Sequence, residues 1–140
     1  MNSSPKSMTL GRRGEWFAAR YLEQNGYRIL EQNYRVSHLE IDLICTDGQT
    51  LAFCEVKTRS CSALSVGAPY YGRPARAVDA QKQKNLILAA RAYLRANTDL
   101  SLRPRLDVIE VYVRKGTTGC EPSDLLKIHH IRNAFGASSS

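Results

Sequence analysis

The amino-acid sequence predicts an α/β protein in which a mixed β-sheet is flanked by helices, in the order α-β-β-β-α-β-β. Two segments, 10–25 and 78–96, repeat apolar residues at helical spacing, whereas the other apolar segments are short and read as strands. A chain of 140 residues has room for one compact domain. We expect this domain to span 9–135, between flexible ends at 1–8 and 136–140.

Local signals place the individual elements. Gly26 is positioned to end the first helix, and the Asp47-Gly48 pair is typical of a tight turn between two hairpin strands. Three strands, a helix and a returning strand then suggest a mixed sheet. The expected elements are a helix at 10–25, strands at 27–34, 39–45 and 50–57, a helix at 78–96, and strands at 106–113 and 126–131.

The charge balance indicates an anionic partner. Twenty Lys and Arg residues against thirteen Asp and Glu residues give a formal net charge of +7. Such a surface attracts polyanions, of which nucleic acid is the commonest and an acidic membrane surface is the other. The alternative is a basic, well-solvated surface that has no specific partner.

Neither a membrane span nor a secretory leader is expected. No stretch approaches the roughly 18 uninterrupted apolar residues of a spanning helix, and the polar N-terminus lacks the apolar centre of a signal peptide. The cysteines, Cys45, Cys54, Cys61 and Cys120, form no CxxC pair. We therefore expect reduced, structural thiols, no zinc site and a cytoplasmic location.

The residues that carry chemistry lie on two neighbouring strands. Alternation predicts that Glu55 and Lys57 share one strand face, and that Asp42 occupies the matching face of the preceding strand, opposite Leu39, Ile41 and Leu43. The hairpin then brings Asp42, Glu55 and Lys57 together. An exposed sheet surface with cross-strand ion pairs is the alternative. It is weakened by the strongly apolar character of both strands.

Two carboxylates on adjacent strands suit Mg²⁺ or Mn²⁺, which prefer oxygen ligands. A cation held by Asp42 and Glu55 can polarise a phosphate oxygen and activate water. Lys57 can assist the attacking water and offset charge on phosphorus, and the carbonyl of Val56 is a further ligand candidate. The sequence therefore predicts hydrolysis of a phosphodiester.

The pattern Asp42…Glu55-Val56-Lys57 resembles the D…(D/E)xK signature of restriction-endonuclease-like nucleases. The chain more closely resembles the YraN family, a bacterial family related to archaeal Holliday-junction resolvases, and the resemblance covers nearly the whole chain. Matching stretches are Gly14-Glu15, Ala18-Ala19, Tyr21-Leu22, Gly26-Tyr27, Glu40-Ile41-Asp42-Leu43-Ile44, Asp47-Gly48, Glu55-Val56-Lys57-Thr58-Arg59, Val78 with Lys82, Arg105 with Asp107-Val108, and Asn133-Ala134-Phe135. The resemblance implies a restriction-endonuclease-like fold.

The resemblance also implies an additional acid and a dimer. Resolvase relatives use a carboxylate of the first helix, which here is Glu15, and they work as dimers, so a homodimer is expected by analogy only. Independently, Glu15 shares a helical stripe with Ala18, Ala19 and Leu22. The equally weighted alternative is a first-turn glutamate that is stabilised by the helix N-terminus.

The chain departs from the family pattern in two places. Leu39 stands where the family usually has Gly, and the loop 60–77 is longer than usual. Neither change affects the expected metal ligands.

Further candidates surround the predicted site. Arg59 is a phosphate contact candidate, and Lys82 either holds a phosphate or extends past the core into water. Glu40 is a further ligand or, more often in such positions, an exposed ion-pairing residue.

In the long loop, aromatic and cationic side chains can stack on unpaired bases, or the loop can be a simple connector. Its candidate nucleic-acid contacts are Tyr70, Tyr71, Arg73 and Arg76.

These observations predict a Mg²⁺- or Mn²⁺-dependent endonuclease that acts on DNA, at branched or damaged structures. The alternative is a nucleic-acid-binding module that keeps the nuclease fold without appreciable catalysis. A scaffold that recruits other proteins has no docking motif to support it.

Overall fold

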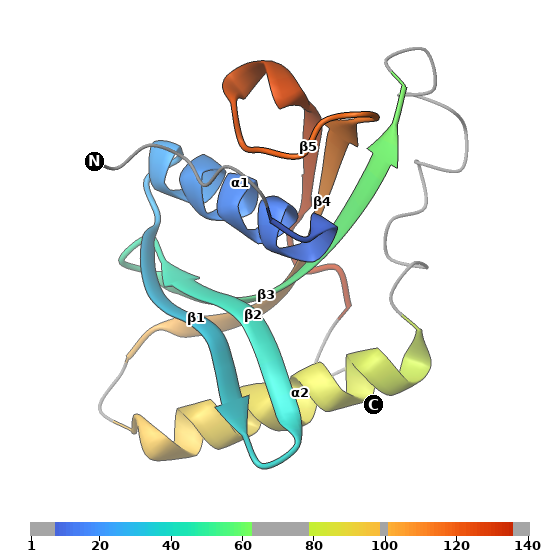
Figure 1. The fold of residues 1–140 in the computed structure, drawn as a ribbon. Coiled ribbons are helices and arrows are strands. Elements are labelled where there is room, and N and C mark those ends of the chain that lie inside the picture. The colour runs from blue at the N-terminus through green and yellow to red at the C-terminus, as the bar shows by residue number, and fades with distance from the viewer. Residues whose placement is uncertain (1–7, 63–78, 99–100, 136–140) are drawn as a thin grey trace.

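The computed structural model describes residues 8–62, 79–98 and 101–135, and its element order confirms the predicted α-β-β-β-α-β-β order (Figure 1). Strand β3 extends four residues beyond the predicted end at Lys57, because it stays paired with β4 as far as Cys61↔Arg114. The elements are α1 (Leu10–Gln24), β1 (Arg28–Val36), β2 (Leu39–Thr46), β3 (Thr50–Cys61), α2 (Ala80–Ala96), β4 (Arg103–Arg114), the short 3₁₀ helix η4 (Pro122–Asp124) and β5 (Leu125–Ile131).

The strands form one mixed sheet in the order β1-β2-β3-β4-β5. All neighbours are antiparallel except β3 and β4, which run parallel from Thr50↔Arg103 to Cys61↔Arg114. A parallel pair needs a crossover connection, and α2 lies within it. The left-handed backbone of Gly48, with φ of 98°, makes the predicted turn between β2 and β3.

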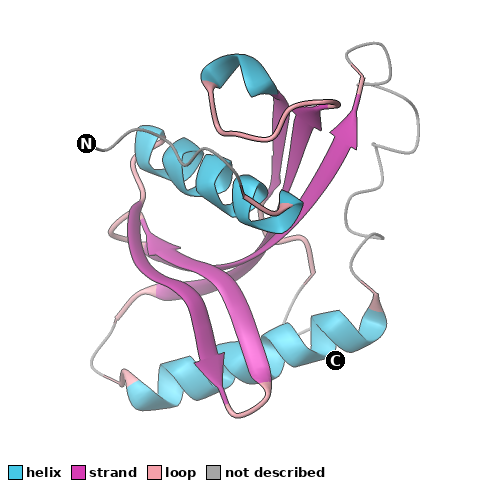
Figure 2. Ribbon diagram, in the orientation of Figure 1, coloured by secondary structure: helices cyan, strands magenta, loops and turns pink. Residues whose placement is uncertain are grey.

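The two helices cover opposite faces of the sheet (Figure 2). Helix α1 buries Phe17, Ala18, Ala19 and Leu22 against one face, and α2 buries Leu86, Ala89, Ala90 and Tyr93 against the other. The four cysteines are buried and free, as the sequence predicts. Within the described residues, no helix has the length and apolarity needed to cross a membrane.

Strict alternation along β2 is wrong. Ile41 packs on the α2 side of the sheet, whereas Leu43, two residues later, packs on the α1 side, and Ile44 returns to the α2 side. The pattern therefore changes phase at Asp42, between Ile41 and Leu43. Asp42 does not share a regular strand face with Glu55, as alternation predicted, but lies at the edge of β3.

Helix α1 approaches β3 very closely at Gly14. A Cβ on this residue would overlap the Thr58 hydroxyl and lie 2.8 Å from Thr58 Cβ. Only glycine permits this contact without a shift of the helix. The contact therefore fixes the distance between α1, including Glu15, and the strand that carries Glu55 and Lys57.

A buried ionic network ties the C-terminal segment to β4. The fully buried Asp107 carboxylate accepts hydrogen bonds from Arg105 Nε at 2.8 Å and from the Asn133 backbone N–H at 3.0 Å, and it lies 2.8 Å from His130 Nε2. Burial raises the pKa of Asp107, but the bonds from His130, Arg105 and Asn133 outweigh burial and leave the pKa below its usual value. The network stabilises the packing of β5 and the segment after it.

Candidate active site

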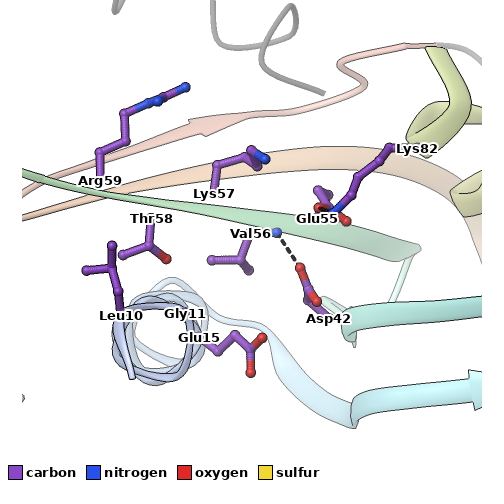
Figure 3. A pocket seen from close by; sticks show the side chains of 10 residues that line it. All are labelled: Leu10, Gly11, Glu15, Asp42, Glu55, Val56, Lys57, Thr58, Arg59 and Lys82. Atoms are coloured by element: carbon purple, nitrogen blue, oxygen red, sulfur yellow. Dashed lines mark hydrogen bonds and ion pairs between the residues drawn. The ribbon is translucent and has the colours of Figure 1, made fainter. Parts of the chain in front are cut away.

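A pocket of about 300 Å³ opens where α1, β2, β3 and α2 meet (Figure 3). All four elements contribute side chains, so residues that are distant in sequence come together there. The lining residues are Leu10, Gly11, Glu15, Asp42, Glu55, Val56, Lys57, Thr58, Arg59 and Lys82. The pocket therefore unites Asp42, Glu55 and Lys57 with Glu15, Arg59 and Lys82.

The pocket lies along the part of β3 that is paired with β4 but no longer with β2. Pairing between β2 and β3 runs from Thr46↔Leu51 to Leu43↔Cys54, whereas β3 continues to Cys61 beside β4. Where the pairing stops, Asp42 Oδ2 accepts a hydrogen bond of 2.8 Å from the Val56 N–H, in place of a strand neighbour (Figure 3). The N–H and C=O of a strand residue point to the same edge, so the Val56 carbonyl also faces the pocket side.

The carboxylates of the pocket affect one another electrostatically. Burial, followed by the nearby charges of Glu55, Glu15 and Glu40, raises the pKa of Asp42 to about 7, although the Val56 hydrogen bond opposes this change. Burial is also the main reason that the pKa of Glu15 is raised. Ionised carboxylates at this place therefore repel one another, and a cation would relieve the repulsion.

Lys82 already supplies one positive charge. Its Nζ lies 3.3 Å from Glu55 Oε2, and the proximity of Glu55 raises the pKa of Lys82. The Glu55 side chain is 12% exposed and that of Lys82 is 56% exposed, so Lys82 reaches in from solvent.

The side chains of Lys57 and Arg59 project from the face of β3 that points away from α1 (Figure 3). Two buried polar atoms at this strand have no hydrogen-bond partner in the structure, the Nε of Arg59 and the hydroxyl of Thr58. Arg59 also lines the pocket, and a guanidinium group is a favourable contact for an anion.

The structure decides between the alternatives for Glu15 and shows an ion-pair partner for Glu40. Helix α1 has no acidic residue in its first turn, so the interpretation of Glu15 as a first-turn glutamate is wrong. Glu15 lines the pocket instead. Glu40 is exposed and lies 4.0 Å from Arg35, as an ion-pairing residue would.

The loop candidates Tyr70, Tyr71, Arg73 and Arg76 lie outside the described residues.

Two residues of this region were not predicted from the sequence. Thr58 lines the pocket under Gly14, and Asn33 lies beside Glu15 and Glu40 with a left-handed backbone. An asparagine inside a strand pattern is itself a signal, because Asn is depleted in strands and tolerates positive φ.

The donor set fits a hard divalent cation only if backbone and water ligands are included. Within the described residues, no three His, Cys, Asp or Glu side chains gather in a way that could hold a metal ion. The carboxylates of Asp42 and Glu55 would supply two of the oxygen donors, and the Val56 carbonyl would supply a third. This number is adequate for Mg²⁺, which keeps several of its own waters.

The fold and the pocket define an α/β protein with a carboxylate-rich pocket that is rimmed by lysine and arginine. The chain belongs to the family described as Uncharacterised protein family UPF0102, whose model matches residues 14–111. This is the YraN family, so the resemblance noted from the sequence is confirmed.

Three UPF0102 proteins illustrate the similarity. One from Chlorobium phaeobacteroides is 44% identical over 126 residues, which cover 90% of this chain and 93% of the relative. One from Caldanaerobacter subterraneus is 40% identical and covers 91% and 94%. One from Chlorobium chlorochromatii is 45% identical over 135 residues, which cover 96% and 97%.

Proposed function

We propose that this protein is a divalent-metal-dependent endonuclease that hydrolyses DNA phosphodiester bonds. The observation that carries the proposal is the convergence of Glu15, Asp42 and Glu55 with Lys57 and Arg59 in one pocket on an unpaired strand edge. A protein that only binds DNA gains nothing from buried carboxylates that face phosphates. Burial of Asp42 and, after it, repulsion by the neighbouring carboxylates raise the pKa of Asp42, and both favour a site that receives a cation.

Asp42 and Glu55 would hold Mg²⁺ or Mn²⁺ with the Val56 carbonyl, and Glu15 would bind the outer waters. The cation, when bound, supplies Lewis acidity toward a phosphate oxygen and a more acidic water. The Val56 N–H fixes the orientation of the Asp42 carboxylate through its hydrogen bond of 2.8 Å. The residues thereby place the oxygen donors in advance, so little reorganisation is needed on binding.

The cationic residues have separate tasks. Lys57, next to Val56 on β3, would donate to the attacked phosphate and to the attacking water. Arg59 is two residues further along the same strand face and would contact the neighbouring phosphate through its guanidinium group. Lys82 would contact phosphate after leaving Glu55. The net charge of +7 would attract the polyanion in a salt-dependent way.

Cleavage of defined DNA substrates tests the proposal. Linear, flapped and four-way-junction DNA, with single-stranded RNA alongside, would be incubated with Mg²⁺, with Mn²⁺ or with EDTA. We expect cleavage of at least one DNA with metal, and none with EDTA.

Variants assign the activity to the pocket. Glu55→Gln and Lys57→Met should each lower the cleavage rate by at least about 100-fold, within the range of a lost acid–base or electrostatic group. The matched controls are Glu31→Gln and Lys115→Met, which change exposed residues outside the pocket. Cleavage that survives in Glu55→Gln would contradict the proposal. Salt-dependent binding without cleavage under any condition would instead support a nucleic-acid-binding module.

A further inference from the structure

Asn33 on β1 has a backbone conformation that is unusual for a strand residue. Its φ is 52°, in the left-handed region. The β1–β2 ladder pairs Gln32↔Leu43 and Tyr34↔Ile41, so Asn33 stands opposite Asp42, between these two pairs. This is the place where the side chains of β2 change phase. The left-handed residue and the displaced Asp42 therefore belong to one local irregularity of the hairpin.

The Asn33 side chain joins two acidic residues from different elements. With its nitrogen toward the carboxylates, the amide donates to Glu40 Oε2 at 3.2 Å and to Glu15 Oε1 at 3.3 Å. Glu15 belongs to α1 and Glu40 to β2. A single amide NH₂ has two hydrogens, one for each carboxylate. Asn33 thus links the helix carboxylate to the strand that presents Asp42.

We propose that Asn33 is a positioning residue of the metal site, an inference that rests on the proposed function. Through its amide, Asn33 holds Glu15 toward Asp42, and through its left-handed conformation it sets the β2 backbone at Asp42. An amide suits this task better than a cation. Lysine or arginine at this place would hold the same carboxylates, but its charge would oppose the entry of a metal ion. An amide orients the carboxylates and leaves the negative charge of the pocket intact.

The first test examines the amide contacts in the metal-free protein. In ¹H–¹⁵N NMR spectra, the side-chain NH₂ signals of Asn33 are assigned by their loss in Asn33→Gly. We expect Glu15→Gln to shift one of the two amide protons and Glu40→Gln to shift the other. Amide signals that move in neither variant would overturn the proposal.

The second test measures Mn²⁺ affinity by the loss of the free-ion signal in electron paramagnetic resonance. Asn33→Gly keeps the backbone conformation accessible and removes the amide, and we expect it to weaken Mn²⁺ binding about tenfold. Asn33→Ala also strains the backbone, so its midpoint of urea unfolding should fall below that of Asn33→Gly. Ser37→Gly is the matched control, because Ser37 is also left-handed in this hairpin, with φ of 58°, but lies outside the pocket. The Mn²⁺ affinity of Ser37→Gly should therefore match that of the wild type.

The outcomes separate the two proposals. Unchanged Mn²⁺ affinity in Asn33→Gly, with binding that depends on Asp42 and Glu55, would overturn the positioning role and leave the proposed function standing. If the wild-type protein binds no Mn²⁺ through Asp42 and Glu55, the proposed function fails. The amide signals then still decide whether Asn33 holds the two carboxylates.

Discussion

Replacing Asp42 with Asn should stabilise the metal-free protein above pH 7. In the wild type, Asp42 accepts a hydrogen bond of 2.8 Å from the Val56 N–H, and the Asn side chain retains an oxygen that can accept it. The substitution removes the negative charge that burial and Glu55 disfavour. Most substitutions of a half-buried hydrogen-bonded residue destabilise a protein. A gain in stability would therefore mark Asp42 as a residue whose charge serves a bound cation rather than the fold.

The raised pKa of Asp42 gives the magnitude. An increase from 3.8 to about 7 corresponds to roughly 4 kcal/mol for a fully enclosed group, at 1.36 kcal/mol for each pKa unit. Water reaches this partly exposed carboxylate and screens it, so we expect about 2 kcal/mol. Because the folded pKa is raised, the stabilisation from protonated Asp42 is complete below about pH 4 and is lost as the pH rises to about 7. The advantage of Asp42→Asn should grow over this interval and then stay constant.

The assay is urea unfolding between pH 4 and pH 9, in EDTA and then in saturating Mn²⁺. Mn²⁺ at 100 times its dissociation constant should stabilise the wild type by about 2.7 kcal/mol and leave Asp42→Asn unchanged, which reverses the order of stability. A metal-binding role for Asp42 is refuted if Asp42→Asn is less stable than the wild type at every pH and both proteins respond equally to Mn²⁺. Asp42 would then be a structural cap of β3.

Three further predictions follow from the packing and the charges. Gly14→Ala should destabilise the protein by about 2 kcal/mol in urea unfolding, because its Cβ would overlap Thr58 on β3. Gly11→Ala is the control and should be neutral or slightly stabilising, because Gly11 has open space around it. Equal effects of the two substitutions would contradict the close approach of α1 to β3 at Gly14. Lys82→Met should bind Mn²⁺ a few-fold more tightly, because no ammonium competes for Glu55. Its DNA binding should weaken, and the slope of log affinity against log salt concentration should fall by about one. Losses of both the Mn²⁺ and the DNA affinity would argue against the exchange of Lys82 for the metal ion at Glu55. Because the pKa of Asp107 is lowered in the folded protein, its ionised form stabilises the fold above about pH 4, and this stabilisation is lost as the pH falls through the folded pKa. Asp107→Asn should therefore cost about 3 kcal/mol at pH 7 and remove the loss of stability in acid. A variant that keeps the wild-type acid profile would show that another group causes the loss.

Local patterns were sufficient to predict the element order and the residues that converge. The apolar spacing of both helices and the Asp47-Gly48 turn depend on neighbours in sequence, and both lie where they were expected. Asp42, Glu55 and Lys57 line one pocket, although Asp42 does not lie on the strand face that alternation predicted. For Glu15 the sequence left two interpretations open, although a helix predicted from residue 10 already places this residue beyond the first turn. The structure confirms the start of α1 at Leu10, with Thr9 as its N-cap, and thereby excludes the first-turn interpretation.

Long-range geometry was not predictable in the same way. The left-handed backbone of Asn33 depends on its position opposite Asp42 in the β1–β2 ladder, which a residue-by-residue pattern does not contain. The contact of Gly14 with Thr58 joins residues 44 positions apart in sequence, and any small residue would satisfy the helix periodicity there. Alternation failed at Asp42 for the same reason, since β2 leaves β3 at this point.

Anomalous diffraction from crystals soaked in Mn²⁺ tests whether Asp42 and Glu55 hold a divalent cation. We expect an anomalous peak between the carboxylates of Asp42 and Glu55, within about 2.5 Å of both and of the Val56 carbonyl oxygen, with Lys82 displaced from Glu55. Crystals of Asp42→Asn should lack this peak. A peak at another place on the molecule, or no peak in the pocket while Lys82 stays on Glu55, would contradict the assignment of this pocket as a divalent-metal site.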